Sequence, residues 1–256
     1  MNILKIGVTS KEVERWQYFL YGEELYNGIA TGEFDNATKE ATKAFQKKHG
    51  LVVDGIVGNR TMAKALSLGH ILMIDEKSEY FPPFPNFKSL SLKQKEAKFG
   101  EIKWRPKPES KTEIIITNNW ESVNMITIQV PQLAKIRMNG SASISFHEKG
   151  AAQMQKLWQD WENAGLLPLI LTWDGAFNPR FVRGGEETKT LSPHAFGIAF
   201  DINYQWNKLG HVPALKGEKG SVRELVKIAN ENGFYWGGHF SKRKDGMHFE
   251  IAKLIN

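Results

Sequence analysis

Residues 191–203 read LSPHAFGIAFDIN, and the fold expected for most of the chain follows from this stretch. Its second half, residues 197–203, predicts a strand whose side chains alternate between two faces. One face is apolar and is expected to join the core: Ile198, Phe200 and Ile202. Asp201 then lies on the opposite face, where a carboxylate inside a sheet is unfavourable unless something binds it. His194 lies in the loop before the strand and is placed to fold back over the same face.

A second strand is expected in residues 245–251, which read DGMHFEI. Alternation turns His248 and Glu250 away from the core there. If the two strands pair, His248 meets Asp201 across the sheet, and the set becomes two histidines and one carboxylate. Three protein ligands with a fourth position for water form the arrangement of a catalytic zinc site. Asp245, three residues before His248, can reach such a water without being a ligand, as a general base requires.

Either segment alone is weak evidence for a metal. A histidine seven positions before an aspartate is a common chance pattern, and a lone histidine in a strand is usually a structural core residue. Glu250 also allows two interpretations, because it can orient His248 or pair with a nearby lysine. The agreement of both segments, with the polar residues on one face in each, favours the metal.

The 256 residues include no cysteine, which excludes disulfide scaffolds, thiolate metal sites and hydrolases with a cysteine nucleophile. A metal site must therefore use histidine, aspartate and glutamate. Lysine and arginine number 34 against 28 acidic residues, a formal net charge of +6. This charge favours anionic polymers such as nucleic acid or bacterial cell wall. The chain has no basic block with interleaved aromatic residues, so nucleic acid is not an expected partner.

Neither stable membrane insertion nor export by a signal peptide is expected. The longest apolar run, residues 164–173, is too short to span a bilayer and contains Pro168. The N-terminus, MNILKIGVTSKEVERW, lacks the long apolar core and the cleavage site of a signal peptide. We therefore expect a soluble protein that is made in the cytoplasm.

Three segments of the chain differ in composition and in the secondary structure that they predict. Residues 1–70 predict a small all-α bundle of three short helices, the first two capped by Ser10 and Asp35. Residues 71–110 hold five prolines and many lysines, which predicts a linker or a strap along a domain surface. Residues 111–256 predict an α+β domain with a central antiparallel sheet. Besides the two strands above, this domain is expected to contain strands at 114–117, 124–130 and 169–173, and helices at 149–164 and 222–233.

The polar residues of the two strands form a pattern found in a known family. The pattern is Ser192-x-His194-x-x-Gly197-x-Ala199-x-Asp201, followed by Asp245-x-x-His248. It resembles the zinc D-alanyl-D-alanine carboxypeptidase and L-alanyl-D-glutamate endopeptidase family, in the form common among bacteriophage endolysins. The resemblance covers most of residues 111–255 and implies a zinc peptidase domain of the α+β class.

The resemblance implies a role for each polar residue of the pattern. Zinc is held by three ligands: His194, Asp201 and His248. Asp245 is the catalytic base, which takes a proton from zinc-activated water and later delivers it to the leaving amine. The family also carries an arginine before the first ligand that stabilises the developing oxyanion. Arg180 fits this role, and Arg183 in the same segment is the alternative.

Residues 8–69 have a resemblance of their own, to the peptidoglycan-binding domain of many cell-wall hydrolases. It rests on the pattern Gly32-x-Phe34-Asp35-x-x-Thr38-x-x-Ala41-x-x-x-Phe45-Gln46, then Gly50-Leu51-x-x-Asp54-Gly55-Ile56-Val57-Gly58-x-x-Thr61. The resemblance implies that bacterial peptidoglycan is the partner, and it leaves open which residues contact the wall.

The two resemblances together imply a monomeric peptidoglycan hydrolase that uses zinc to cleave amide bonds of the stem peptide. The function expected first is that of an endolysin, held in the host bacterial cytoplasm before release and acting at the peptidoglycan layer. Three alternatives stay open. The chain is otherwise a D,D-carboxypeptidase that trims terminal D-alanine, a secreted effector that degrades cell wall, or a catalytically silent wall-binding or virion structural protein.

Overall fold

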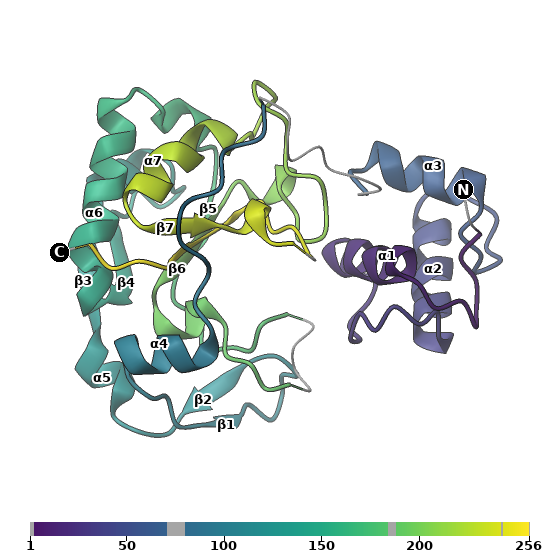
Figure 1. Cartoon of the computed structure of the whole chain (residues 1–256), viewed down its shortest axis with the longest axis horizontal. Helices are drawn as coiled ribbons and strands as arrows, with labels where there is room; N and C mark the ends of the chain where they lie inside the picture. Colours follow the sequence, from purple (N-terminus) through teal and green to yellow (C-terminus); the bar gives the residue numbers. More distant parts are fainter. Residues whose placement is uncertain (1–2, 71–79, 184–187, 242, 256) are drawn as a thin grey trace.

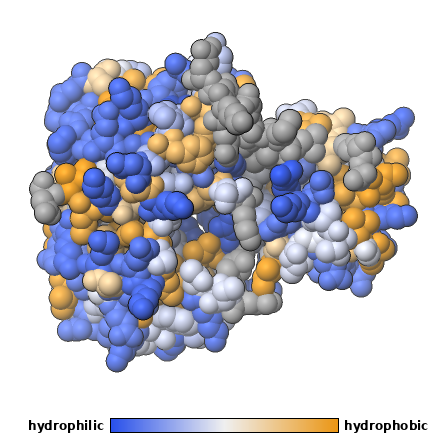
Figure 2. All heavy atoms as spheres, in the orientation of Figure 1, coloured by the Kyte–Doolittle hydropathy of each residue, from blue (hydrophilic) through white to orange (hydrophobic). Residues whose placement is uncertain are grey.

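The computed structural model describes residues 3–70, 80–183, 188–241 and 243–255. It has two lobes, a small helical one built from the N-terminal residues and a larger one that contains the sheets (Figure 1). Each lobe has its own cluster of buried apolar side chains. The α+β class predicted from the sequence is confirmed. Hydrophilic side chains are spread over both lobes, with apolar ones in smaller groups between them (Figure 2).

The small lobe consists of three short helices: α1 (Lys11–Gly22), α2 (Asn36–Lys48) and α3 (Asn59–Ser67). The two expected caps are present, because Ser10 Oγ accepts a hydrogen bond from the amide of Val13 and Asp35 Oδ1 accepts one from the amide of Thr38. The helices meet around Trp16, whose indole donates to Thr42 at 2.9 Å within the bundle. The local signals at the helix starts therefore predicted this lobe well.

The sheet of the large lobe has four antiparallel strands in the order β5–β6–β8–β7. The strands are β5 (Trp173–Gly175), β6 (Ala199–Ile202), β7 (Phe234–Trp236) and β8 (His248–Ile251). The two strands proposed from the sequence are the central pair, and their register places Asp201 opposite His248. On the other face Phe200 stacks on Phe249, with 5.5 Å between ring centroids, and both pack against Trp161 of α6.

The remaining elements surround this sheet. Two more antiparallel pairs are formed by β1 (Trp104–Pro106) with β2 (Ile114–Ile116), and by β3 (Met125–Gln129) with β4 (Ser143–His147). The helices are α4 (Leu92–Phe99), α5 (Trp120–Asn124), α6 (Glu148–Asn163) and α7 (Val226–Glu231). Short 3-10 helices are η1 (Pro131–Lys135), η2 (Leu167–Leu169), η3 (Pro193–Phe196), η4 (Tyr204–Trp206), η5 (Arg223–Leu225) and η6 (Gly237–His239).

The strand expected at residues 169–173 is wrong for most of its length. Residues 167–169 form η2, and the strand β5 begins only at Trp173. The amides of Leu171 and Thr172 donate to Asn203 Oδ1 at 2.7 and 3.1 Å, so a side chain takes the place of a strand partner. The helix expected at 222–233 is divided between η5 and α7.

The segment expected to be a linker packs closely on the large lobe where the structure describes it. Residues 71–79 lie outside the described residues, whereas residues 80–91, here called the strap, run across the larger lobe (Figure 1). Within the strap, the carbonyl of Pro82 accepts a hydrogen bond from His239 Nε2 at 2.9 Å, and Phe81 is buried in the core. Residues 92–110 then add α4 and β1, so this stretch is part of the large lobe's packing.

The two lobes touch through polar contacts at the end of α1. Glu23 accepts hydrogen bonds from Lys208 at 2.9 Å and from His211 at 3.3 Å, both residues of the large lobe. His211 also forms an isolated β-bridge with His70. The hydrogen bond from His211 and those from the lysines hold the pKa of Glu23 well below its usual range. A buried, ionised carboxylate thus anchors the small lobe on the large one.

None of the helices in the described part of the chain has the length and apolar character needed to cross a membrane.

We predict that Asn203→Ala lowers the free energy of unfolding by about 2 kcal/mol, because it leaves partly buried backbone groups of Leu169, Leu171 and Thr172 without their side-chain partner. Asn203 is fully buried in a left-handed conformation, with φ at 55°, and its amide also donates to the carbonyls of Leu169 and Gly220. Urea unfolding followed by tryptophan fluorescence measures the change. Asn163→Ala, at the exposed end of α6, serves as the control and should shift stability by less than about 0.5 kcal/mol. Equal effects of the two substitutions would contradict the role of Asn203.

Candidate metal centre

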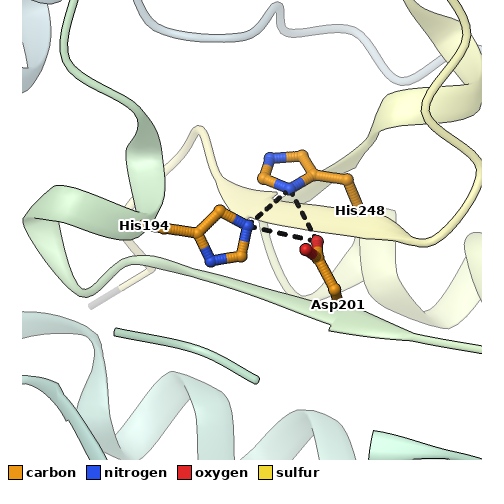
Figure 3. A group of neighbouring side chains, drawn as sticks. All are labelled: His194, Asp201 and His248. Atoms are coloured by element: carbon orange, nitrogen blue, oxygen red, sulfur yellow. Dashed lines mark hydrogen bonds and ion pairs between the residues drawn. The ribbon is translucent and has the colours of Figure 1, made fainter. Parts of the chain in front are cut away.

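Three side chains from separate elements converge in the large lobe (Figure 3). His194 lies on η3, Asp201 on β6 and His248 on β8. His194 Nε2 is 3.1 Å from Asp201 Oδ1 and 3.1 Å from His248 Nδ1, and the last two atoms are 3.0 Å apart. All three residues are buried. The structure therefore brings together the three ligands proposed from the sequence.

The local backbone explains how His194 reaches the strands. Ser192 caps η3 through its side chain, and Gly197 ends the turn in a left-handed conformation with φ at 60°. This left-handed conformation favours glycine, and a Cβ there would also displace the end of the Met125 side chain, which lies 2.4 Å away. The turn thus folds the histidine back over β6.

Hydrogen bonds on the far side of each ring assign the tautomers of the two histidines. His194 Nδ1 donates to the carbonyl of Ala176 at 2.5 Å, and His248 Nε2 donates to Glu250 at 3.0 Å. The nitrogen of each ring that faces Asp201 then offers a lone pair to a metal ion, provided that His248 first gives up the second proton that Asp201 and Glu250 stabilise on its ring. Two imidazole nitrogens and a carboxylate oxygen, all acceptors and all within about 3 Å of one another, are the donor set that a metal ion satisfies.

The charges of the site also favour a cation. Burial lowers the pKa of His194, which keeps its imidazole neutral as a ligand must be. Burial raises the pKa of Asp201, but the two histidines outweigh it and hold the pKa well below its usual range. Burial likewise lowers the pKa of His248, and its hydrogen bonds to Asp201 and Glu250 outweigh that and raise it to about 10. Two buried carboxylates thus draw positive charge to the point where the ligands meet.

The chemistry of the donor set fits zinc. Two imidazoles and one carboxylate leave a fourth position of a tetrahedral ion for water or substrate. Within residues 3–70, 80–183, 188–241 and 243–255, no second cluster of three such ligands occurs. A metal bound by this chain through described residues is therefore expected here.

Asp245 lies beside the three ligands, as the sequence predicted for a base. It lines a cavity of about 220 Å³ together with Asp201, His248 and Arg180. Its Oδ1 is buried and has no hydrogen-bond partner among the described residues, and burial raises its pKa. A Cβ at Gly237 would lie 2.4 Å from the carbonyl oxygen of Asp245, so this glycine lets the loop approach the site. An acceptor without an internal partner is suited to take a proton from a molecule in the cavity.

The two candidate arginines occupy different places. Arg180 lines the cavity, and burial lowers the pKa of its guanidinium. It also lies close enough to Asp201 and Asp245 to interact electrostatically with their carboxylates. Its Nη1 donates to the carbonyl of Phe181 at 3.1 Å. Arg183 borders the cavity and also a larger groove outside it. Arg180 is therefore the better placed of the two for charge that develops at the ligands, and its role stays a prediction.

Sequence reasoning missed the residues that support the ligands from the strap and α4. The hydroxyl of Ser89 donates to Glu250 Oε1, so the strap contacts the carboxylate that holds His248. Lys95 of α4 is buried and donates to the carbonyl of Leu191 at 2.9 Å, just before η3. No signal in the sequence connects these residues with strands that follow 100 to 160 positions later.

The fold and the site define a class, that of α+β proteins with a candidate metal centre on an antiparallel sheet. Residues 186–251 match the family model of D-alanyl-D-alanine carboxypeptidases, and residues 9–65 match the model of a peptidoglycan binding domain. The family suspected from the sequence is confirmed for these two regions. No curated protein matches the chain. The two matches identify a metallopeptidase that degrades peptidoglycan.

We predict that Glu250→Ala weakens zinc affinity by about 10- to 100-fold, because His248 loses the partner that holds its ring. Glu250→Gln keeps an acceptor and should lose less. Competition with a chromogenic chelator measures the affinity. The control is Glu231→Ala, which removes an exposed carboxylate of α7. Zinc affinity that is the same in Glu250→Ala and in the control would show that Glu250 does not position the ligand.

Proposed function

We propose that this protein is a zinc peptidase that cuts an amide bond within the peptidoglycan stem peptide, and that it acts as an endolysin. One observation carries the proposal. Three buried acceptors that fit a metal ion share a cavity with a carboxylate that has no internal partner, Asp245. The match to the carboxypeptidase family supports the reaction class, and the match of residues 9–65 supports the substrate.

His194, Asp201 and His248 would hold the ion. Zinc bound there supplies Lewis acidity, which makes water ionise near neutral pH and polarises an amide carbonyl. Asp245 accepts the proton of the attacking water at its buried Oδ1. The same carboxyl then delivers that proton to the leaving amine, because amide cleavage needs a base first and an acid afterwards. Burial raises the pKa of Asp245, which favours its holding the proton between the two steps.

Arg180 supplies the positive charge of the proposed mechanism. Its guanidinium lines the same cavity as the ligands, at the side of Asp201 and Asp245. A fixed cation there stabilises the oxyanion that forms when water adds to the carbonyl, an effect commonly worth about 3–4 kcal/mol for one donor. Arg183, further toward the groove, is the alternative for this role.

The proposed organisation assigns residues 1–70 to wall binding, 71–110 to the connection and 111–256 to catalysis. The small lobe keeps the enzyme on an insoluble substrate, and the chain's net charge of +6 favours its attraction to the anionic wall. We propose that the protein is a monomer that is held in the host bacterial cytoplasm until its release and then acts at the peptidoglycan layer. A secreted effector with the same two parts is the biological alternative.

A D,D-carboxypeptidase that removes terminal D-alanine is the second candidate function. The match of residues 186–251 to the D-alanyl-D-alanine carboxypeptidase family favours it. Both candidates use the same metal centre and base, and they differ only in the bond that is cut.

Asp245→Asn is expected to retain zinc and to lose activity by about 100-fold or more, because the base is removed while the ligands stay. His194→Ala should lose both zinc and activity. Release of soluble peptides from purified peptidoglycan measures activity, and elemental analysis measures zinc. Normal hydrolysis by Asp245→Asn would refute the assignment of the base.

Removal of metal by a chelator is expected to abolish hydrolysis, and added zinc should restore it.

Mass spectrometry of the products from a defined muropeptide then identifies the bond. Two peptide fragments indicate the endopeptidase, and loss of a single D-alanine indicates the carboxypeptidase. A chain that binds wall and releases neither product would be the silent wall-binding protein.

A further inference from the structure

The cavity at the metal centre continues into a larger groove of about 770 Å³. The two share a rim made of six residues: Ser89, Val182, Arg183, Thr190, Phe240 and Arg243. Beyond that rim the groove is lined by segments far apart in the sequence, namely the strap, three residues near the end of the sheet (Tyr235, His239 and Ser241) and Tyr18 of α1. The groove is therefore continuous with the place where the bond would be cut, and it is large enough for several residues of a substrate.

Positive charge gathers along the groove. Arg183, Arg243 and Lys88 line it, and Arg180 lies in the adjoining cavity. None of these four side chains pairs with a carboxylate of the described residues. Arg183 and Arg243 also lie close enough to lower the pKa of Arg180. Like charges held together repel one another. The nearby carboxylates of Asp201 and Asp245 offset this repulsion only in part, and an anionic ligand relieves the remainder.

Two uncharged groups orient Arg243, and the nearby Asp245 carboxylate offsets only part of its charge. Its Nη1 donates to the backbone carbonyl of Arg183, and its guanidinium lies over the ring of Tyr18 with 5.5 Å to the centroid. A carbonyl and an aromatic ring orient a guanidinium without neutralising it. The remaining N–H groups form a donor set suited to a carboxylate.

Aromatic rings give the same groove an apolar surface beside its positive charge. Phe84 of the strap stacks on His239 with 4.4 Å between centroids, and Tyr235 stacks on Phe240 at 5.8 Å. Phe84 is 49% exposed, which is unusual for a large apolar side chain held in such a stack. Rings fixed in this way offer flat apolar surface to methyl groups and to the backbone of a peptide.

We propose that this groove binds an acidic peptide, the part of the stem next to the scissile bond, with Arg243 pairing with its carboxylate and Tyr18 forming one wall. This inference rests on the proposed function and assigns the wall-binding lobe a second role. Through Tyr18 the small lobe shapes the site at which soluble substrate binds.

The carboxylate contact is tested with two soluble muropeptides that differ only in a free carboxylate or a carboxamide on the stem glutamate. In the holoenzyme Arg243→Gln, we expect KM for the free carboxylate to rise about 10- to 100-fold with little change in kcat. The KM for the carboxamide should change by less than about threefold. Arg105→Gln removes the same charge from an exposed position on β1 and is the control.

Equal loss of kcat/KM on both muropeptides would show that Arg243 only maintains structure, and no loss on either would show that it has no role. Either result overturns the carboxylate contact while leaving the proposed function intact. If wild-type protein loaded with zinc cleaves neither muropeptide, the proposed function itself fails, and the inference fails with it.

The role of the small lobe is tested by Tyr18→Ala on the same soluble muropeptide. We expect KM to rise about tenfold, because the cation–π contact and one wall of the groove are lost. Leu66→Ala, at an exposed apolar residue of α3 in the same lobe, is the control and should leave KM unchanged. A lobe that serves only as an anchor has no effect on soluble substrate, so an unchanged KM in Tyr18→Ala would overturn this part of the inference.

Discussion

The pairing of β6 with β8 in a single register is the constraint on which the site depends. Asp201 stands opposite His248, and on the other face Phe200 stands opposite Phe249. A slip of one residue in either strand would turn its ligand into the core and its phenylalanine toward the cavity. Packing of both rings against Trp161 therefore sets the positions of the ligands. The apolar core and the polar centre are two faces of the same register.

Burial of so many ionisable groups is costly unless they compensate one another. His194, Asp201, His248 and Glu250 are each less than 10% exposed. A chain of hydrogen bonds offsets this cost. His248 donates to Glu250, and Glu250 in turn accepts a hydrogen bond from Ser89 of the strap. The strap thus does more than connect two lobes, because it completes the hydrogen bonding behind a ligand. This explains why residues after Tyr80 pack like part of the domain.

The extent of what the sequence predicts follows from the range of each interaction. Alternation within a strand is local, so the sequence predicted the faces of β6 and β8 and the convergence of the three candidate ligands. Helix caps such as Asp35 are local too, and α1 and α2 begin where their caps predict. The contact of Ser89 with Glu250 spans 161 positions and has no local signal. The strand predicted at residues 169–173 was wrong for the same reason, because the amides of Leu171 and Thr172 donate to a distant side chain, that of Asn203.

The contacts between the lobes bear on what a wall-binding module does for its enzyme. A module on a flexible tether raises only the effective concentration of the wall near the catalyst. In this structure Glu23 is buried between Lys208 and His211, and removal of that carboxylate would leave the buried Nε2 of His211 without its acceptor. Specific polar contacts of this kind select one orientation of the lobes. Wall that is bound by the small lobe would then reach the groove from one defined direction. Such a fixed orientation lowers the activation barrier of the reaction, in addition to keeping the substrate close to the catalytic groups.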